Sequence, residues 1–310
     1  MIPLDEIQRA RERLGDDVLR TPVVEVAEGT WAKLECLQPI GSFKLRGALN
    51  AIRAASPDEL RDGVVTASAG NMAQGVAWAA REAGVRARIV APDTAPRAKL
   101  DRVEDLGGEV LLVSHEEWWQ TMVDRRHPEV DGLFVHPVED ELVMAGNGTI
   151  GLELCEQLDG FDAVVIPWGG GGLATGVASA VKALRPDVHV VAVEPETAAP
   201  LTAAFAAGEP VAIDYAPSFV DGAGGRALLP TMWVRARDLV DAAVAVTLDE
   251  VAGAIRLLAE RGHVVAEGAG ALALAAARRG AAGDGRAVCI VSGGNIDASV
   301  LASILVGETP

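Results

Sequence analysis

A lysine stands at the predicted first turn of a helix in the segment 41–48, which reads GSFKLRGA. Apolar residues recur at helical spacing from Leu45 to Ile52, so we expect a helix from Phe43 to about Ala55. A helix N-terminus carries partial positive charge and disfavours an ammonium group there. Lys44 is thereby held closer to its neutral, nucleophilic form, which forms imines with aldehydes. By itself the pattern is weak, because a lysine near a helix start is most often a solvated surface residue.

A run of glycines is the second feature with chemical meaning. It consists of Gly169, Gly170, Gly171 and Gly172. The run follows a predicted buried strand (161–167) and precedes a helix that begins at Leu173. Backbone N–H groups can converge there at a helix N-terminus without obstruction by side chains, which makes an anion site. A tight turn that needs positive φ is the alternative explanation, but it does not require so many glycines.

The same run also fits a different ligand. Gly169, Gly171 and Ala174 satisfy the Gly-x-Gly-x-x-Gly/Ala pattern of dinucleotide-binding proteins, and Glu194 ends the next predicted strand (188–193). A nicotinamide-dinucleotide-binding oxidoreductase is therefore an alternative. It leaves the segments around Lys44, Ser68 and Ser292 unexplained, and we rank it lower.

Two polar loops follow predicted strands. Ser68-Ala69-Gly70-Asn71 comes after the strand 64–67, and Ser292-Gly293-Gly294-Asn295 comes after the strand 287–291. Ligands of open α/β sheets bind at the carboxyl ends of strands. A lone serine or asparagine at such a place is more commonly a helix N-cap.

Together, in this order and spacing, the four segments resemble the fold-type II pyridoxal-phosphate enzymes. The serine/threonine dehydratases and serine racemase are the most similar members, and the resemblance runs from about Leu4 to Val306. It implies an α/β fold of two open, twisted, mainly parallel sheets with flanking helices. It also implies that a small domain (61–137) is inserted into a large one (1–60 and 138–310), with the cofactor, pyridoxal 5'-phosphate, in the cleft between them.

The resemblance assigns roles to individual residues. It implies that Lys44 holds the cofactor and is the catalytic base. The implied cofactor-binding residues are Phe43, Lys44, Asn71, Gly169, Gly170, Gly171, Gly172, Leu173, Ser292 and Glu267. The implied substrate-binding residues are Ser68, Ala69, Gly70, Asn71, Met72 and Asp221. Glu267 has an alternative role as the cap of a helix that runs to Arg278.

Two positions bear on the reaction. By the resemblance, Ser292 hydrogen-bonds the pyridine nitrogen, and a hydroxyl leaves that nitrogen largely neutral, which suits β-elimination. Serine racemase has a serine where this chain has Ala69, and that serine is the acid–base on the ring face opposite the lysine. We therefore expect elimination, with racemisation slow or absent.

Departures from the family pattern leave the substrate open. Met72 replaces a usual histidine, Asn147 a common glutamine, and the segment 221–226 (DGAGGR) is unusually glycine-rich. If this segment borders the substrate, its small residues enlarge the pocket; a flexible surface loop is the equal alternative. Some relatives bind a divalent cation through a glutamate, a backbone carbonyl and an aspartate. In this chain Glu194 and Ala198 match the first two, but Pro200 replaces the aspartate. We therefore expect this metal site to be absent or weak.

Composition bounds the remaining classes. The formal charge of −17 opposes nucleic-acid binding, and no apolar run in the 310 residues reaches the length of a membrane span. The three cysteines lack metal-like spacing, and the N-terminal segment is charged rather than signal-like, so we expect a cytoplasmic protein. The resemblance implies a homodimer that acts on a small amino acid.

The predicted function is pyridoxal-phosphate-dependent dehydration and deamination of L-threonine or L-serine-like β-hydroxy amino acids to a 2-oxo acid and ammonia. The alternatives are a lyase for another β-hydroxy amino acid, such as 3-hydroxyaspartate or a phenylserine-like compound, and, ranked lower, a racemase.

Overall fold

The larger of two sheets carries the strands that lead into the glycine run and the Ser292 loop. The computed structural model describes residues 1–310. This sheet has six strands in the order β1-β2-β10-β7-β8-β9. Only β1 is antiparallel to its neighbour. The strands are β1 (Val23–Ala27), β2 (Thr30–Leu34), β7 (Ala163–Pro167), β8 (His189–Pro195), β9 (Ala242–Val246) and β10 (Ala287–Val291). β7 and β10 are buried at every residue, because helices cover both faces of the sheet.

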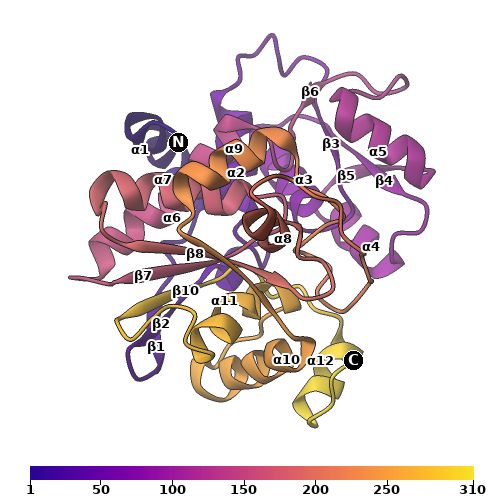
Figure 1. Cartoon of the computed structure of the whole chain (residues 1–310). Helices are drawn as coiled ribbons and strands as arrows, with labels where there is room; N and C mark the ends of the chain where they lie inside the picture. The colour runs from indigo at the N-terminus through magenta and orange to yellow at the C-terminus, as the bar shows by residue number, and fades with distance from the viewer.

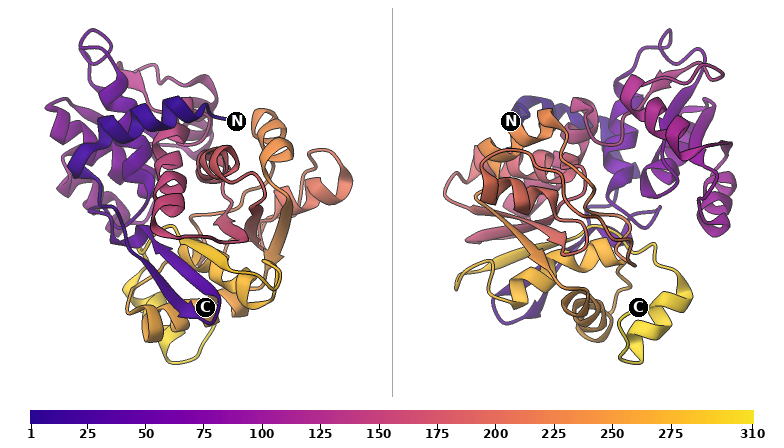
Figure 2. Two further views of the ribbon diagram at one scale, coloured as in Figure 1. Left: turned by 90° about the vertical axis from the view of Figure 1, so that its left-hand side faces the viewer. Right: turned by 45° about the vertical axis from the view of Figure 1, so that its right-hand side comes forward.

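The smaller sheet has four parallel strands in the order β5-β4-β3-β6. They are β3 (Val64–Ala67), β4 (Ala87–Pro92), β5 (Gly108–Val113) and β6 (Leu133–Phe134). Figure 2 shows that the two sheets, each with its own helices, form two lobes.

Helices join and cover the strands (Figure 1). They are α1 (Leu4–Leu14), α2 (Lys44–Ala54), α3 (Asn71–Ala83), α4 (Arg97–Asp105), α5 (His115–Asp124), α6 (Glu141–Gln157), α7 (Gly172–Leu184), α8 (Pro200–Ala207), α9 (Pro230–Leu239), α10 (Leu248–Leu257), α11 (Gly268–Arg278) and α12 (Ala298–Leu305). Short 3₁₀ or π turns lie at Gly15–Asp17, Glu35–Leu37 and Leu258–Gly262. None of the helices is both long and apolar enough to span a membrane.

The apolar face of α2 packs into the core of the smaller sheet. Leu45, Leu49 and Ile52 are buried in one cluster with Val64 of β3 and Val76 of α3. Each buried leucine or isoleucine contributes about 1.5–3 kcal/mol to stability. The helix that begins with Lys44 is thus held against the four-stranded lobe.

The predicted fold class is confirmed, and the elements that the sequence indicated form close to their expected bounds. The expected helix 43–55 is α2, and the strands expected at 64–67, 161–167 and 287–291 are β3, β7 and β10. The sequence did not indicate the antiparallel edge strand β1 or the other edge strand β9.

Candidate active site

Backbone hydrogen bonds join the lysine segment to the serine loop, although the two are far apart in sequence. The amide of Phe43 donates to the carbonyl oxygen of Ser292 at 3.0 Å, and the amide of Gly294 donates to the carbonyl oxygen of Gly41 at 2.9 Å. The start of α2 is therefore fixed against the carboxyl end of β10. Lys44 is the first residue of α2 and lies in its first turn, as the sequence predicted, whereas the predicted first residue, Phe43, is the N-cap.

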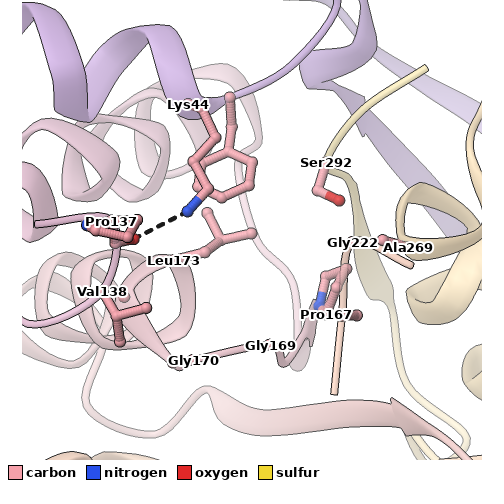
Figure 3. A pocket seen from close by; sticks show the side chains of 14 residues that line it. Lys44, Pro137, Val138, Pro167, Gly169, Gly170, Leu173, Gly222, Ala269 and Ser292 are labelled. Atoms are coloured by element: carbon pink, nitrogen blue, oxygen red, sulfur yellow. Dashed lines mark hydrogen bonds between the residues drawn. The ribbon is translucent and has the colours of Figure 1, made fainter. Parts of the chain in front are cut away.

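The amine of Lys44 lies inside the site rather than in solvent. Its Nζ donates to the carbonyl oxygen of Pro137 at 2.9 Å, as Figure 3 shows. Burial lowers the pKa of Lys44 to about 8, and the carboxylate of Glu267 opposes this shift. A lysine with this pKa has a far larger neutral fraction near physiological pH than an ordinary lysine, and the neutral form is the one that acts as a nucleophile or base.

One cavity brings together most of the predicted cofactor-binding residues. Its empty volume, including space open to solvent, is about 400 Å³. It is lined by Phe43, Lys44, Pro137, Val138, Pro167, Gly169, Gly170, Gly171, Gly172, Leu173, Gly222, Ala223, Ala269 and Ser292. Figure 3 shows Lys44 and Ser292 on two sides of the cavity, with the glycine run below them.

The glycine run fits a phosphate group. None of the amides of Gly169 to Gly172 donates a hydrogen bond to a backbone carbonyl, and Gly172 begins the helix α7. Gly171 has a φ of +95°, and a Cβ at Gly170 would lie 2.4 Å from a methyl carbon of Val138. Free N–H groups at a helix start, in a place where no side chain fits, form a cradle for an anion.

Asn71 and Glu267 adjoin this cavity. The Nδ2 of Asn71 donates to Oε1 of Glu267 at 2.7 Å, and burial raises the pKa of Glu267 to about 7. A Cβ at Gly293 would lie 2.2 Å from the same Oε1, and one at Gly222 would lie 3.7 Å from it. Gly222 lines the cavity, whereas Asn71 and Glu267 do not, so the pair lies just behind that part of the wall. Glu267 is the N-cap residue of α11, but its side chain makes no capping bond.

The predicted substrate residues are less uniformly placed. Ser68, Ala69 and Gly70 are half-buried in the turn from β3 to α3, where the amide of Gly70 donates to Oγ of Ser68 at 3.2 Å. Met72 is only 2% exposed and packs in the core that α2 shares, a position that favours a packing role over contact with substrate. Asp221 is exposed and pairs with Lys99 of α4.

The residues suggested for a cation do not fit one. Both oxygens of the Glu194 carboxylate accept hydrogen bonds from the start of α8, at 2.9 Å from the amide of Leu201 and at 2.8 Å from the amide of Thr202. Burial raises the pKa of Glu194 to about 7. Gly224 packs so closely on the carbonyl oxygen of Ala198 that a Cβ there would lie 2.2 Å away. The buried carboxylate of Glu194 is equally unsuited to a ribose, which removes the support for a dinucleotide site.

The sequence reasoning missed several residues of the site. Pro137 and Val138 reach the cavity from a loop that carries no motif, and Ala269 reaches it from the first turn of α11. Asn295 lies in the same loop as Ser292 and contacts Asn71 and Ile40, contacts that the sequence does not indicate.

Comparisons with known proteins agree with this geometry. A profile of the family described as "Pyridoxal-phosphate dependent enzyme" matches residues 15–293. The L-threonine ammonia-lyase of Thermotoga maritima is 40% identical, over 98% of this chain and 78% of that protein. The structure of maize serine racemase is similar with a TM-score of 0.87 and 34% identity, over 98% of this chain and 96% of that one. Processed threonine deaminase isoform 2 from Solanum lycopersicum gives a TM-score of 0.86 and 33% identity, over 97% of this chain and 86% of that one. Because the profile match spans most of the sequence, the chain belongs to the family of pyridoxal-phosphate-dependent enzymes, and pyridoxal phosphate is its cofactor.

Proposed function

We propose that this enzyme eliminates water from L-threonine, L-serine or a similar β-hydroxy amino acid, and that the product then takes up water to release ammonia and a 2-oxo acid. The observation that carries the proposal is the placement of the Lys44 amine in one cavity with the glycine run and Ser292. The relatives named for threonine ammonia-lyase and threonine deaminase support the choice of reaction.

The residues of the cavity divide the work of holding the cofactor. The free amides of the glycine run would bind its phosphate, Ser292 its pyridine nitrogen and Asn71 its ring oxygen, while Phe43 would pack on the ring. Bound pyridoxal phosphate supplies an electron sink that stabilises negative charge at the substrate α-carbon. A hydroxyl at position 292, in place of a carboxylate, limits that sink and favours loss of a β-substituent.

Lys44 would move the proton. Its neutral Nζ would accept the proton from the α-carbon of the bound substrate. The bond from the β-carbon to the hydroxyl oxygen then breaks, and the hydroxyl takes up a proton and leaves as water. The released unsaturated amine reacts with water to give the 2-oxo acid and ammonia. Ser68 and Gly70 would bind the substrate carboxylate.

A bulkier substrate is the second candidate, because Gly222 and Ala223 line the cavity. Small residues at this wall leave room for the side chain of 3-hydroxyaspartate or of a phenylserine-like compound. A racemase ranks lower, because Ala69 offers no proton donor in the loop where serine racemase has a serine.

We also propose a domain division, an oligomeric state and a compartment. A small domain of residues 61–137 is supported by the four-stranded sheet, all of whose strands lie between Val64 and Phe134. The family resemblance supports a homodimer. The three free cysteines agree with a location in the cytoplasm. Size-exclusion chromatography with light scattering tests the dimer.

The test of function is the absorbance spectrum of the purified protein with pyridoxal phosphate, followed by separate addition of L-threonine, L-serine and threo-3-hydroxyaspartate. A cofactor band at about 410–420 nm together with release of 2-oxo acid supports the lyase and identifies its substrate. A band without oxo-acid release from any of the three overturns the proposed reaction and leaves the family assignment intact.

A further inference from the structure

We propose that Asn295 is a positioning residue that fixes the side-chain amide of Asn71, so that its N–H groups face Glu267 and the cofactor ring oxygen. The inference rests on the role proposed above for Asn71 and extends it to a residue with no assigned role.

The argument starts from a backbone carbonyl, which can only accept hydrogen bonds. The carbonyl oxygen of Ile40 lies 2.9 Å from the side-chain amide nitrogen of Asn295, so this nitrogen must be the donor. The same nitrogen lies 2.7 Å from Asn71, which must therefore present its oxygen, Oδ1. The amide nitrogen of Asn71 then points the other way, toward Oε1 of Glu267 at 2.7 Å.

This chain of bonds leaves Asn71 with a specific capacity. A primary amide has two N–H groups, and the bond to Glu267 uses one of them. The second remains for the ring oxygen of the cofactor. A reversed amide would present an oxygen both to the carboxylate of Glu267 and to the ring oxygen, and neither can donate to it when ionised.

The surroundings of Asn295 keep it in one orientation. Gly41 has a φ of +73°, and a Cβ there would lie 2.7 Å from Oδ1 of Asn295, so only glycine leaves room for this oxygen. Nη1 of Arg102 also donates to this oxygen at 3.2 Å on the exposed side, but the contacts with Ile40 and Gly41 already set the orientation without it. Asn295 follows β10, whereas Asn71 begins α3 and Arg102 lies on α4. Asn295 therefore links the larger lobe to two helices of the smaller one.

The experiment compares Asn295→Asp and Asn295→Ala with the native protein. Two quantities are measured: the dissociation constant of pyridoxal phosphate, and the ratio of the visible to the near-ultraviolet band of the bound cofactor, which reports the proton on its ring oxygen. Both variants should weaken binding at least tenfold and move intensity from the visible to the near-ultraviolet band. Arg102→Ala is the matched control, since it removes a contact to Asn295 that does not orient Asn71, and both quantities should stay within twofold of native.

A second comparison separates positioning from general support of the fold. In an Asn71→Ala background, Asn295→Ala should change the dissociation constant less than twofold, because the amide it orients is already gone. An equal loss in both backgrounds, or an unchanged band ratio in Asn295→Ala, overturns the proposal. Both readouts concern binding, so a native protein that loads the cofactor but deaminates none of the tested amino acids refutes the proposed reaction and leaves this test valid.

Discussion

At the scale of single residues, the chemistry depends on an amine that is neutral when it is needed. The pKa of Lys44 is lowered by burial, because the surrounding protein hydrates an ammonium group poorly. Glu267 lies close enough to favour the charged form and partly offsets this effect. The pKa of Lys44 is therefore the result of burial, which lowers it, and of the Glu267 carboxylate, which raises it.

This balance predicts the pH dependence of cofactor loading. The neutral fraction of Lys44 grows as pH rises through about 8, so the rate at which the apoprotein reacts with pyridoxal phosphate should rise with a midpoint near that pH. Glu267→Gln removes the charge that favours the ammonium form, and its midpoint should be lower. Stopped-flow absorbance from pH 6 to 10.5 measures both. Exposed Glu209→Gln is the control, and a native midpoint near the ordinary lysine value of 10.5 would contradict the argument.

Ala69 predicts the stereochemical outcome. It is half-buried in the loop before α3. By the resemblance to serine racemase, a serine hydroxyl at this position would be the proton donor on the face opposite Lys44. Ala69→Ser should raise the rate of D-serine formation from L-serine at least tenfold while elimination continues, as chiral chromatography would measure. Ala69→Gly is the control for a change in loop packing. No gain in racemisation would argue against the missing donor as the reason.

At the scale of elements, the turn from β7 to α7 can be formed only by residues without a side chain. Gly171 has a φ of +95°, and a Cβ there would lie 2.5 Å from the ring of Trp168, which is fully buried. The backbone takes this path only where neither strain nor a side chain opposes it.

Gly171→Ala should therefore lower the free energy of unfolding by about 1–3 kcal/mol and weaken binding of pyridoxal phosphate at least tenfold. Urea unfolding and cofactor titration measure the two effects. Gly160→Ala is a matched control before the same strand, because a Cβ there meets nothing within 4 Å. If cofactor affinity in Gly171→Ala equalled that of Gly160→Ala, the glycine run would not be the phosphate cradle.

The contact between Glu194 and the start of α8 should make the stability of the protein depend on pH. Burial raises the pKa of Glu194 from 4.5 to about 7, so the folded state favours the neutral carboxyl. Stability from this group is complete below the unfolded pKa of about 4.5 and is lost as pH rises toward 7. The free energy of unfolding, measured in urea, should fall between pH 5 and pH 8 in the native protein. In Glu194→Gln this fall should be smaller by about 2–3 kcal/mol. Glu209→Gln should follow the native curve, and a Glu194→Gln curve that also did so would refute the buried carboxyl as its cause.

At the scale of the whole molecule, a buried ionic cluster ties the lysine helix to the larger lobe. Arg46 is 1% exposed, and its guanidinium donates to Glu35 at 2.7 Å and 2.8 Å and to Glu153 of α6 at 2.7 Å. Lys33 of β2 completes the cluster through Glu153. Burial by itself would raise the pKa of Glu35, but the charge and hydrogen bonds of Arg46 hold this pKa below its usual value.

Removing one partner leaves a buried charge uncompensated. Arg46→Met should lower the free energy of unfolding by about 3–5 kcal/mol at pH 7, as urea denaturation of the apoprotein would show. Arg53→Met on the same helix breaks a partly exposed pair with Asp17 and should cost at most about 1 kcal/mol. Similar losses in the two variants would mean that burial does not distinguish the two ion pairs.

Some elements of the fold follow from the sequence pattern, and others do not. Patterns of apolar residues predicted α2, β3, β7 and β10, because each depends on local periodicity and turn residues. They did not predict the edge strand β1, which forms a hairpin with β2. They also did not predict the edge strand β9, whose partner β8 is distant in the chain. Met72 shows the same limit: its position in the motif suggested substrate contact, but packing between α2 and α3 buries it in the core.

By itself, the sequence determined which residue types are available for chemistry: a lysine at a helix start, a glycine run that frees backbone amides, and polar loops after strands. These follow from local rules of helix ends, turns and strand ends. Only the tertiary structure decided their environment. The lowered pKa of Lys44, the commitment of Glu194 to α8 and the orientation of Asn71 by Asn295 all depend on groups brought together from distant segments. Desolvation and hydrogen-bond direction belong to that assembled environment, and no local pattern encodes them.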